Sequence, residues 1–534
     1  MKTHPVVTRV CLFCCGLWAV TALAQAPDVS SVRGDRMRAD IQFLSSDQLE
    51  GRRFLEHGSE VAAQFIAAEF AKAGLKPAFG NSFLQEFTVI QYRPDAAERR
   101  LTLARGGRER VLEFGKDYTG GGFPHDLTAA GGVVFAGYGI TAPEYKYDDY
   151  AGVDARGKFV LVIEREPQDN DPNSVFNGIG NTMYSNAQAK LRIAQQHGAI
   201  GVLVMRAPNR PPEPPRQRPA QAGPRAGAAR MTPPPSNAIA DNVVHIPLFN
   251  VTDEFAAELF SAAGKKPAEV QKAIDATLKP ASFELPDTRL EVHLANSEFR
   301  KATAMNVVGI LEGSDPALKN ETVVFGGHFD HLGVRNGAVY GGADDDASGT
   351  AAVMELARAF AKGPRLKRTL VFAAFDGEEA GLLGSYYYAA HPYGKTGVEL
   401  NMDMISRNDT PLTPEEAAQR PARDNSSEMF LIGAFYSPEL RSILERNAKE
   451  VGLEVNYRYD REPTQNVLWR GDSFPFVLDR VPAVWLFSGF TPDYHTPNDT
   501  VDKINVPKME KTARLLYLTA IEIGNAPAVP AFLH

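Results

Sequence analysis

The sequence predicts an α/β fold, in which a mostly parallel (mixed) sheet is flanked by helices on both faces and carries a β-rich insertion. From residue 300 onward, short apolar segments rich in β-branched residues alternate with helical segments, as in a parallel sheet covered on both faces. Between residues 130 and 285, strands bounded by glycine dominate instead. The chain has 534 residues, which favours two domains or one domain with a large insertion.

The composition is that of a water-soluble globular protein. Hydrophobic residues make up 44% of the chain and charged residues 23%. The net charge of -8 favours solubility and gives no support for binding to nucleic acid.

The first 24 residues are typical of a cleaved secretory signal. Lys2 and Arg9 precede an apolar segment over 10–20, and Ala22-Leu23-Ala24 then forms a small-x-small cleavage site. A membrane anchor is the alternative, but the apolar segment is short for a membrane span. All three cysteines lie inside this segment (Cys11, Cys14, Cys15). We therefore expect an exported protein, periplasmic or secreted, without disulfide bonds or later membrane spans.

The elements before residue 300 follow from their apolar periodicity. Phe65, Ile66 and Phe70 repeat at helical spacing within a helical region over 36–75, and Gly74 is placed to end it. Residues 85–115 have β character. The next elements are strands at 132–139, 157–163 and 198–204 and a helix at 187–197. Residues 206–236 are rich in Pro, Arg and Ala and predict a disordered surface loop, with a polyproline recognition segment as the alternative.

After residue 300 the predicted strands and helices alternate regularly. The strands are predicted at 306–311, 322–327, 369–375, 398–405, 429–434 and 483–487, with a helix at 349–360 after the second strand. In such sheets, functional groups gather beyond the carboxyl ends of the strands.

Five candidate metal ligands follow that rule, because each stands at the end of a separate apolar segment: His328, Asp345, Glu379, Asp403 and His495. Together they suit a hydrolase with two zinc ions. One carboxylate can bridge both cations, and each cation then takes one His and one further carboxylate.

The local context of the ligands adds further candidates. Asp330 stands two residues after His328, where its carboxylate could accept the second ring N–H of that histidine. His331 is a competing ligand that we interpret as a supporting or structural residue. Glu378 stands beside Glu379, free to take a proton from water near the cations. The acids Asp344 to Asp346 lack the alternating spacing of a calcium-binding EF-hand loop.

In this order, these segments closely resemble the M28 family of zinc peptidases, of the aminopeptidase type. The similarity covers about 300–505, and more weakly 36–125, where Leu44 to Arg52 look like the family's N-terminal signature. The segment 129–286 resembles a protease-associated (PA) domain in Gly137-Tyr138-Gly139 and Asp148-Asp149-Tyr150. The resemblance implies a di-zinc exopeptidase-like fold. It divides the chain into a signal peptide (1–24), the first part of the peptidase domain (25–128), the insertion (129–286) and the catalytic domain (287–534).

The resemblance also implies a role for each site residue. Asp345 would bridge two zinc ions, one of them also bound by His328 and Asp403, the other by Glu379 and His495. Glu378 would be the general base, Asp330 the partner of His328, and Tyr494 would help to stabilise the oxyanion. One position departs from the family pattern, because Ser473 stands where many members carry His.

The resemblance implies an aminopeptidase that removes N-terminal residues from peptide or protein substrates. A carboxypeptidase with the same metals is the first alternative, and Arg407 or Arg470 could then bind the substrate carboxylate. A glutaminyl-cyclase-like enzyme would use a single zinc, and a non-catalytic receptor-like relative would be expected to have lost ligands. The complete ligand set argues against both. The insertion could restrict access to the site, bind a partner or act as a passive lid.

Overall fold

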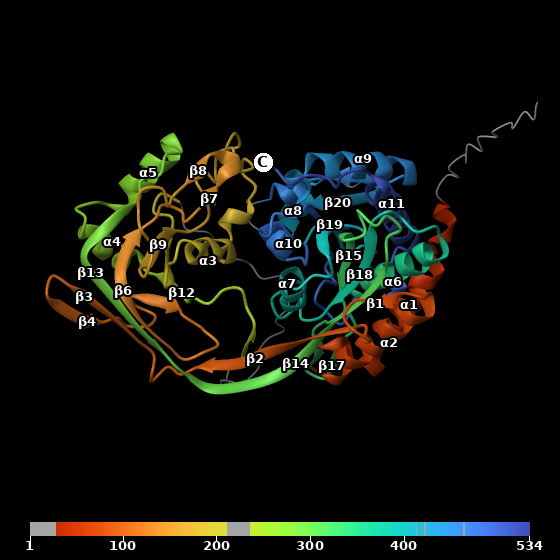
Figure 1. Cartoon of the computed structure of the whole chain (residues 1–534), viewed down its shortest axis with the longest axis horizontal. Coiled ribbons are helices and arrows are strands. Elements are labelled where there is room, and N and C mark those ends of the chain that lie inside the picture. Colours follow the sequence, from red (N-terminus) through yellow and green to blue (C-terminus); the bar gives the residue numbers. More distant parts are fainter. Residues whose placement is uncertain (1–27, 211–234, 413, 421–422, 463–464, 534) are drawn as a thin grey trace, which may run out of the picture.

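The computed structural model describes residues 28–210, 235–412, 414–420, 423–462 and 465–533. It contains two lobes, each built around its own sheet (Figure 1). The main lobe consists of the described residues within 28–94, 236–239 and 296–533 around a ten-stranded sheet. The second lobe consists of the other described residues around an eight-stranded sheet. The predicted signal over 1–24, and most of the predicted loop over 206–236, lie outside the described residues.

The main sheet has a parallel centre and antiparallel sides, which confirms the predicted fold class. Four neighbouring central strands run parallel: β18 (Thr369–Phe375), β15 (Glu321–His328), β19 (Lys395–Met402) and β22 (Ala483–Phe487). On one side follow three antiparallel strands, β14 (Asn296–Leu311), β2 (Leu84–Pro94) and β11 (Ser236–Ile239), while the short β1 (Lys76–Pro77) also pairs with β14. On the other side, β20 (Glu428–Ile432) is antiparallel to β22 and parallel to the edge strand β21 (Glu454–Asn456).

Helices cover both faces of this sheet. One face packs against α1 (Gly34–Leu44), α2 (His57–Ala73), α6 (Ala347–Lys362), α9 (Pro438–Val451) and α11 (Val506–Asn525). The other face packs against α7 (Leu383–Ala390) and α10 (Phe474–Leu478). The short α8 (Pro414–Gln419) lies between β19 and β20 in the chain. Inside the first face, Phe325 stacks on Phe372 with ring centroids 5.2 Å apart, and both rings pack near Phe360 of α6.

The predicted helical region over 36–75 is interrupted in the structure. Helices α1 and α2 are separated by the 3₁₀ segment η2 (Asp47–Arg52), in which Glu50 and Gly51 have φ angles of 50° and 69°. Left-handed residues cannot continue a right-handed helix, so the chain turns there. The predicted end at Gly74 is confirmed, since Gly74 caps α2 with φ 83°.

The second lobe extends beyond the predicted bounds of 129–286. Its sheet runs β4 (Arg108–Val111), β3 (Arg100–Arg105), β13 (Phe283–Leu294), β6 (Leu127–Phe135), β9 (Phe159–Ile163), β10 (Gly201–Met205), β12 (Leu248–Val251) and β5 (Tyr118–Gly120). Its helices are α3 (Ala187–Gln196), α4 (Asp253–Ser261) and α5 (Pro267–Thr277). The strands β3, β4 and β5 had been expected in the peptidase domain, but they pair within this sheet.

The two segments on which the PA resemblance rests contact each other in the second lobe. The buried carboxylate of Asp149 accepts hydrogen bonds from the backbone N–H of Tyr138 (2.9 Å), the N–H of Ile140 (3.2 Å) and the hydroxyl of Tyr147 (2.7 Å). A Cβ atom on Gly137 would lie 2.0 Å from the same carboxylate. This explains why glycine stands at that position. The identity of this lobe as a PA domain stays a prediction.

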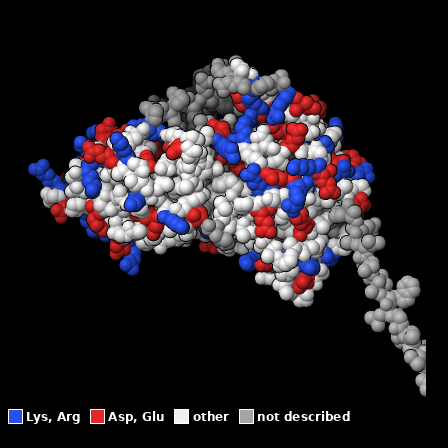
Figure 2. Space-filling view, turned by 90° about the horizontal axis from the view of Figure 1, so that it is seen from above, with Lys and Arg blue, Asp and Glu red and all other residues white. Residues whose placement is uncertain are grey.

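The lobes are joined by the long strands β2 and β14, which run beneath both in Figure 1. Direct contacts also connect them, including ion pairs of Arg192 with Asp479 (2.6 Å) and of Arg480 with Glu144 (3.1 Å). The face in Figure 2 carries interleaved basic and acidic side chains over both lobes. None of the described helices has the length and apolar character needed to cross a membrane.

Candidate metal centre

The five predicted ligands converge at the carboxyl ends of the central strands of the main sheet. His328 is the last residue of β15, and Asp403 directly follows β19 rather than lying inside it. Glu379 stands in the turn after β18, and His495 in the loop after β22. Asp345 precedes α6. Parallel strands end at one edge of the sheet, so residues up to 167 positions apart in the chain (His328 to His495) meet there.

The carboxylate of Asp345 lies between the two predicted histidine ligands. Its Oδ1 is 3.3 Å from Nε2 of His328, and its Oδ2 is 3.0 Å from Nε2 of His495. Each histidine also faces one further carboxylate. Nε2 of His328 lies 3.7 Å from Oδ1 of Asp403, and Nε2 of His495 lies 3.1 Å from Oε1 of Glu379. The arrangement is two groups of one His and one acid that share Asp345.

The three consecutive acids have different partners, and only Asp345 faces the histidines with its carboxylate. Oδ1 of Asp344 accepts hydrogen bonds from the N–H (2.9 Å) and the hydroxyl (2.7 Å) of Ser406. Asp346 caps α6 by accepting from the N–H of Gly349 at 2.8 Å, and it also accepts from the N–H of His328 at 3.2 Å. The neighbours of Asp345 therefore hold the loop in place, which leaves Asp345 for the centre.

Two charged residues outside the ligand set fix the ligand loops. The buried Arg52, from the N-terminal signature, donates to the carbonyl oxygens of Phe329 (2.7 Å), Gly341 (2.6 Å) and Gly342 (3.1 Å). Asp499 accepts from the N–H of Asp344 (3.0 Å) and the N–H of Asp345 (3.1 Å). The loops that carry His328 and Asp345 are thus tied to residues far away in the sequence.

The side chains present fit a metal centre. Two groups of side chains each bring three potential ligand atoms within 4.8 Å of one another. One group is His328, Asp345 and Asp403, and the other is His331, Asp345 and Glu379. Nε2 of His328, Oδ1 of Asp403 and Oε1 of Glu379 are buried without a hydrogen-bond partner among the described residues. Buried polar atoms are normally paired, and paired acids and histidines aimed at one point are typical of cation sites.

His331 lies closer to the centre than its interpretation as a supporting residue implied. Its Nδ1 is 2.9 Å from Oε1 of Glu379 and 3.9 Å from Oδ1 of Asp345. Its ring and that of His495 have centroids 5.7 Å apart. His495 lines the adjoining pocket, whereas His331 is sealed beneath it. The prediction of His495 as the ligand is therefore retained, with His331 behind Glu379.

The predicted base and its neighbour Asp330 are coupled through the backbone. Oδ1 of Asp330 accepts a 2.9 Å hydrogen bond from the N–H of Glu378, whose carboxylate Oε2 lies 3.8 Å from Nε2 of His328. The ring of His328 was expected to donate a hydrogen bond to the carboxylate of Asp330, but in the structure another oxygen of Asp330 is closer. Nδ1 lies 3.1 Å from the backbone carbonyl oxygen of Asp330 and 3.7 Å from its carboxylate, so the carbonyl is the closer acceptor.

The pKa values of the acids at the centre are shifted in two opposite directions. Burial opposes the ionisation of Asp345 and Glu379, but the neighbouring histidines outweigh it. The pKa of Asp345 is therefore well below its usual range, and the pKa of Glu379 falls to about 2. Burial and the carboxylates Glu379 and Asp472 instead raise the pKa of Glu378 well above its usual range. Without a cation, Glu378 therefore favours its protonated form, and nearby positive charge would make it a base.

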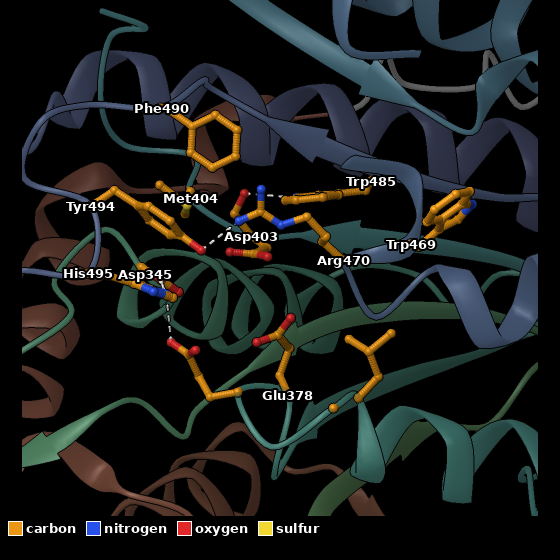
Figure 3. A pocket seen from close by; sticks show the side chains of 13 residues that line it. Asp345, Glu378, Asp403, Met404, Trp469, Arg470, Trp485, Phe490, Tyr494 and His495 are labelled. Atoms are coloured by element: carbon orange, nitrogen blue, oxygen red, sulfur yellow. Dashed lines mark hydrogen bonds and ion pairs between the residues drawn. The ribbon is translucent and has the colours of Figure 1, made fainter. Parts of the chain in front are cut away.

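A pocket of about 300 Å³ opens beside this centre. Its lining combines the acids and His495 with large apolar side chains, of which Figure 3 labels Met404, Trp469, Trp485 and Phe490. Leu382 also lines the pocket. Tyr494 also lines it, stacked on the ring of His495 with centroids 3.8 Å apart. Its hydroxyl accepts a 2.8 Å hydrogen bond from Nη2 of Arg470. Tyr494 thus lies where a role in substrate binding had been predicted.

The two arginines proposed for a carboxylate partner lie in different places. Arg470 lines the pocket, whereas Arg407 is paired with Asp493 at 2.8 Å outside the lining. Ser473 is buried and does not line the pocket. The sequence did not predict three residues of the site, Trp469, Trp485 and Asp499. Trp469 and Asp499 stand outside the strands and α-helices, and Trp485 only continues the apolar pattern of β22. The sequence Thr496 to Thr500 after His495 was the only signal for Asp499.

Comparisons with known proteins agree with the geometry. The family model "Peptidase family M28" matches residues 306–520. A protein named probable zinc metalloprotease from Leptosphaeria maculans is 29% identical over 313 residues, which are 52% of this chain and 68% of that protein. The leucine aminopeptidase 2 of Trichophyton equinum is 28% identical over 233 residues, 39% of this chain and 42% of that protein. The chain thus spans about two thirds of the first relative and less than half of the second.

Among solved structures, the aminopeptidase from Aneurinibacillus sp. strain AM-1 aligns with 95% of this chain and 96% of its own, at 20% identity and a TM-score of 0.44. The segment 306–520 contains all five candidate ligands, Glu378, Asp330 and Tyr494. The resemblance of the chain to peptidase family M28 therefore rests on the segment that carries the candidate site.

Proposed function

We propose that this chain is a zinc-dependent aminopeptidase that removes N-terminal residues from peptides at a centre of two zinc ions. The observation that carries the proposal is the position of Asp345 between His328 and His495, with Asp403 and Glu379 completing two groups. The names of the relatives support zinc and aminopeptidase activity. We also propose export, to the periplasm or the medium, on the basis of the signal-like residues 1–24.

In this proposal, His328, Asp345 and Asp403 would hold one zinc ion, and Asp345, Glu379 and His495 the other. The chemistry that zinc supplies when bound is polarisation of the scissile carbonyl and acidification of a water molecule. Arg52 and Asp499 keep the ligand loops in position through their hydrogen bonds to the backbone.

Glu378 would act as the general base. Its carboxylate reaches within 3.8 Å of the ligand nitrogen of His328, and its backbone is fixed by the bond to Asp330. It would accept the proton of the attacking water at a carboxylate oxygen and later donate it to the leaving amine. The hydroxyl of Tyr494, at the opposite side of the pocket, would donate to the oxygen of the scissile carbonyl as negative charge develops there (Figure 3).

The proposal is tested by mass spectrometry of an unblocked peptide incubated with the full-length chain. The reaction is run with zinc, with a chelator, and with zinc restored after chelation. We expect residues to be lost one by one from the N-terminus, only when zinc is present. Chelator-sensitive shortening from the C-terminus would replace the aminopeptidase by a carboxypeptidase, and an intact peptide under all conditions would contradict the proposed activity.

A further inference from the structure

The side chain of Arg470 extends into the pocket beside the candidate metal centre (Figure 3). It follows the 3₁₀ turn η7 (Val467–Trp469). Its guanidinium lies 5.0 Å from the ring centroid of Phe490 and 5.8 Å from that of Tyr494, and Nη2 donates to the Tyr494 hydroxyl at 2.8 Å. Two aromatic rings and the Tyr494 hydroxyl therefore hold the guanidinium in place beside the pocket.

No carboxylate pairs with this arginine among the residues that the structure describes. Within the described part of the chain, its side chain makes one hydrogen bond, to the hydroxyl of Tyr494. Arg407, the other arginine close to this site, shows the contrast, because Asp493 already neutralises it at 2.8 Å. A guanidinium has five N–H donors, and the remaining donors of Arg470 have no hydrogen-bond partner among the described residues and are not among the fully buried unpaired atoms. They are available to a molecule in the pocket.

The charge balance of the pocket points to an anion. Four carboxylates line the pocket: Asp345, Glu378, Glu379 and Asp403. Two divalent cations would match these four negative charges, so that the guanidinium of Arg470 is left as the uncompensated charge. A positive charge in a partly desolvated, aromatic-walled pocket is costly without a partner. A planar guanidinium suits a carboxylate in particular, because both can form two parallel hydrogen bonds.

Building on the proposed function, we infer that Arg470 binds a carboxylate of the substrate and selects peptides that carry an acidic group close to the scissile bond. Two groups of a peptide have this chemistry, the side chain of an N-terminal glutamate and the terminal carboxylate of a very short peptide. The apolar walls formed by Trp469, Trp485 and Phe490 would contact the aliphatic part that carries the carboxylate. Arg470 is then a specificity-determining residue of the site.

The test measures binding and therefore does not depend on turnover. Four dipeptides are titrated calorimetrically into the full-length, zinc-supplemented Glu378→Gln variant: Glu-Ala, Gln-Ala, and the C-terminal amide of each. The same titrations are made with Arg470→Gln and Arg470→Lys added, and with Arg407→Gln added as the matched control. Cleavage of the four dipeptides by the wild-type chain is measured separately, so failure of the peptidase proposal is seen independently of failure of this inference.

We expect the dipeptides with the recognised carboxylate to bind about 10- to 100-fold more tightly than their neutral counterparts, the range for a charged hydrogen-bonding pair. Arg470→Gln should abolish that ratio, Arg470→Lys should keep part of it, and Arg407→Gln should leave it unchanged. If the two Glu dipeptides bind more tightly than the two Gln dipeptides, the recognised group is the glutamate side chain. If the two free acids bind more tightly than the two amides, the recognised group is the C-terminal carboxylate. Equal binding of all four dipeptides, or an unchanged ratio in Arg470→Gln, would overturn the inference and leave Arg470 as a residue that only positions Tyr494.

Discussion

The backbone N–H of Glu378 donates a 2.9 Å hydrogen bond to the carboxylate of Asp330. Asp330 follows β15 and Glu378 follows β18, so this bond fixes the turn that carries the proposed base to the strand that carries His328. The bond uses the main chain of Glu378, which leaves its side chain free to face the pocket. The position of the base therefore depends on the loop rather than on its own carboxylate.

Replacing Glu378 by Gln should separate catalysis from metal binding. The amide keeps the size of the side chain but cannot accept the proton of the attacking water, so we expect turnover to fall about 10²- to 10⁴-fold. Zinc content should stay at the wild-type value, because Glu378 is not among the predicted ligands. The measurement is the rate of peptide hydrolysis together with the zinc content of the same sample. A near-normal rate would remove Glu378 from the mechanism.

The affinity for zinc should rise with pH. Burial lowers the pKa of His495, but the carboxylates of Asp345 and Glu379 beside it outweigh this and raise the pKa to about 10. Without metal, this imidazole is therefore protonated at neutral pH, and zinc must displace its proton. We expect the apparent affinity to increase about tenfold per pH unit for each proton displaced, between pH 6 and 8. Competition with a chromophoric chelator measures it, and an affinity independent of pH would refute the ligand role of His495.

Arg52 should stabilise the main lobe far more than its neighbour Arg53. Removing the buried guanidinium in Arg52→Ala leaves the carbonyl oxygens of Phe329, Gly341 and Gly342 without their donor, and we expect a loss of about 3 kcal/mol in the free energy of unfolding. Arg53 is exposed, so Arg53→Ala should change stability by less than about 0.5 kcal/mol. Denaturant unfolding of both variants measures the difference. Equal effects would show that Arg52 does not hold the loops.

The stability of the second lobe should fall as the pH rises from about 4 to about 7. Burial raises the pKa of Asp149 from 3.8 to about 7, although the hydrogen bonds from Tyr147, Ile140 and Tyr138 partly offset this. The folded state thus binds a proton more tightly than the unfolded state. Its contribution to stability is full below pH 3.8 and is lost as the pH passes 7. Asp149→Asn should flatten this slope in calorimetric unfolding, whereas Asp171→Asn, at an exposed acid, should not. An unchanged slope in Asp149→Asn would contradict the assignment.

The strand pattern made most of the main lobe predictable from the sequence. The segments 369–375 and 483–487 coincide with β18 and β22, because buried parallel strands are continuous apolar runs with clear ends. The rule that functional groups follow such strands then located His328, Asp403 and the two glutamates. Asp345 could be separated from Asp344 and Asp346 only through the resemblance. In the structure, the partners Ser406 and Gly349 make the same distinction.

Features that depend on distant contacts could not be predicted. Nothing near Arg52 in the sequence shows that its partners are the backbone carbonyls of residues 329, 341 and 342. Arg470 follows an irregular turn without periodicity, so its entry into the pocket became visible only with the fold. The strands β3 to β5 were placed in the wrong lobe, because short strands carry no local signal for the sheet that they join.

Native mass spectrometry of the zinc-supplemented chain tests the central claim, a pair of zinc ions that share Asp345. The account predicts two zinc ions per chain in the wild type and loss of metal in Asp345→Ala, whose change removes both carboxylate oxygens that face His328 and His495. Asp502→Asn, at an exposed acid of the same region, should retain both ions. A single zinc ion in the wild type, or two ions retained by Asp345→Ala, would contradict the shared site.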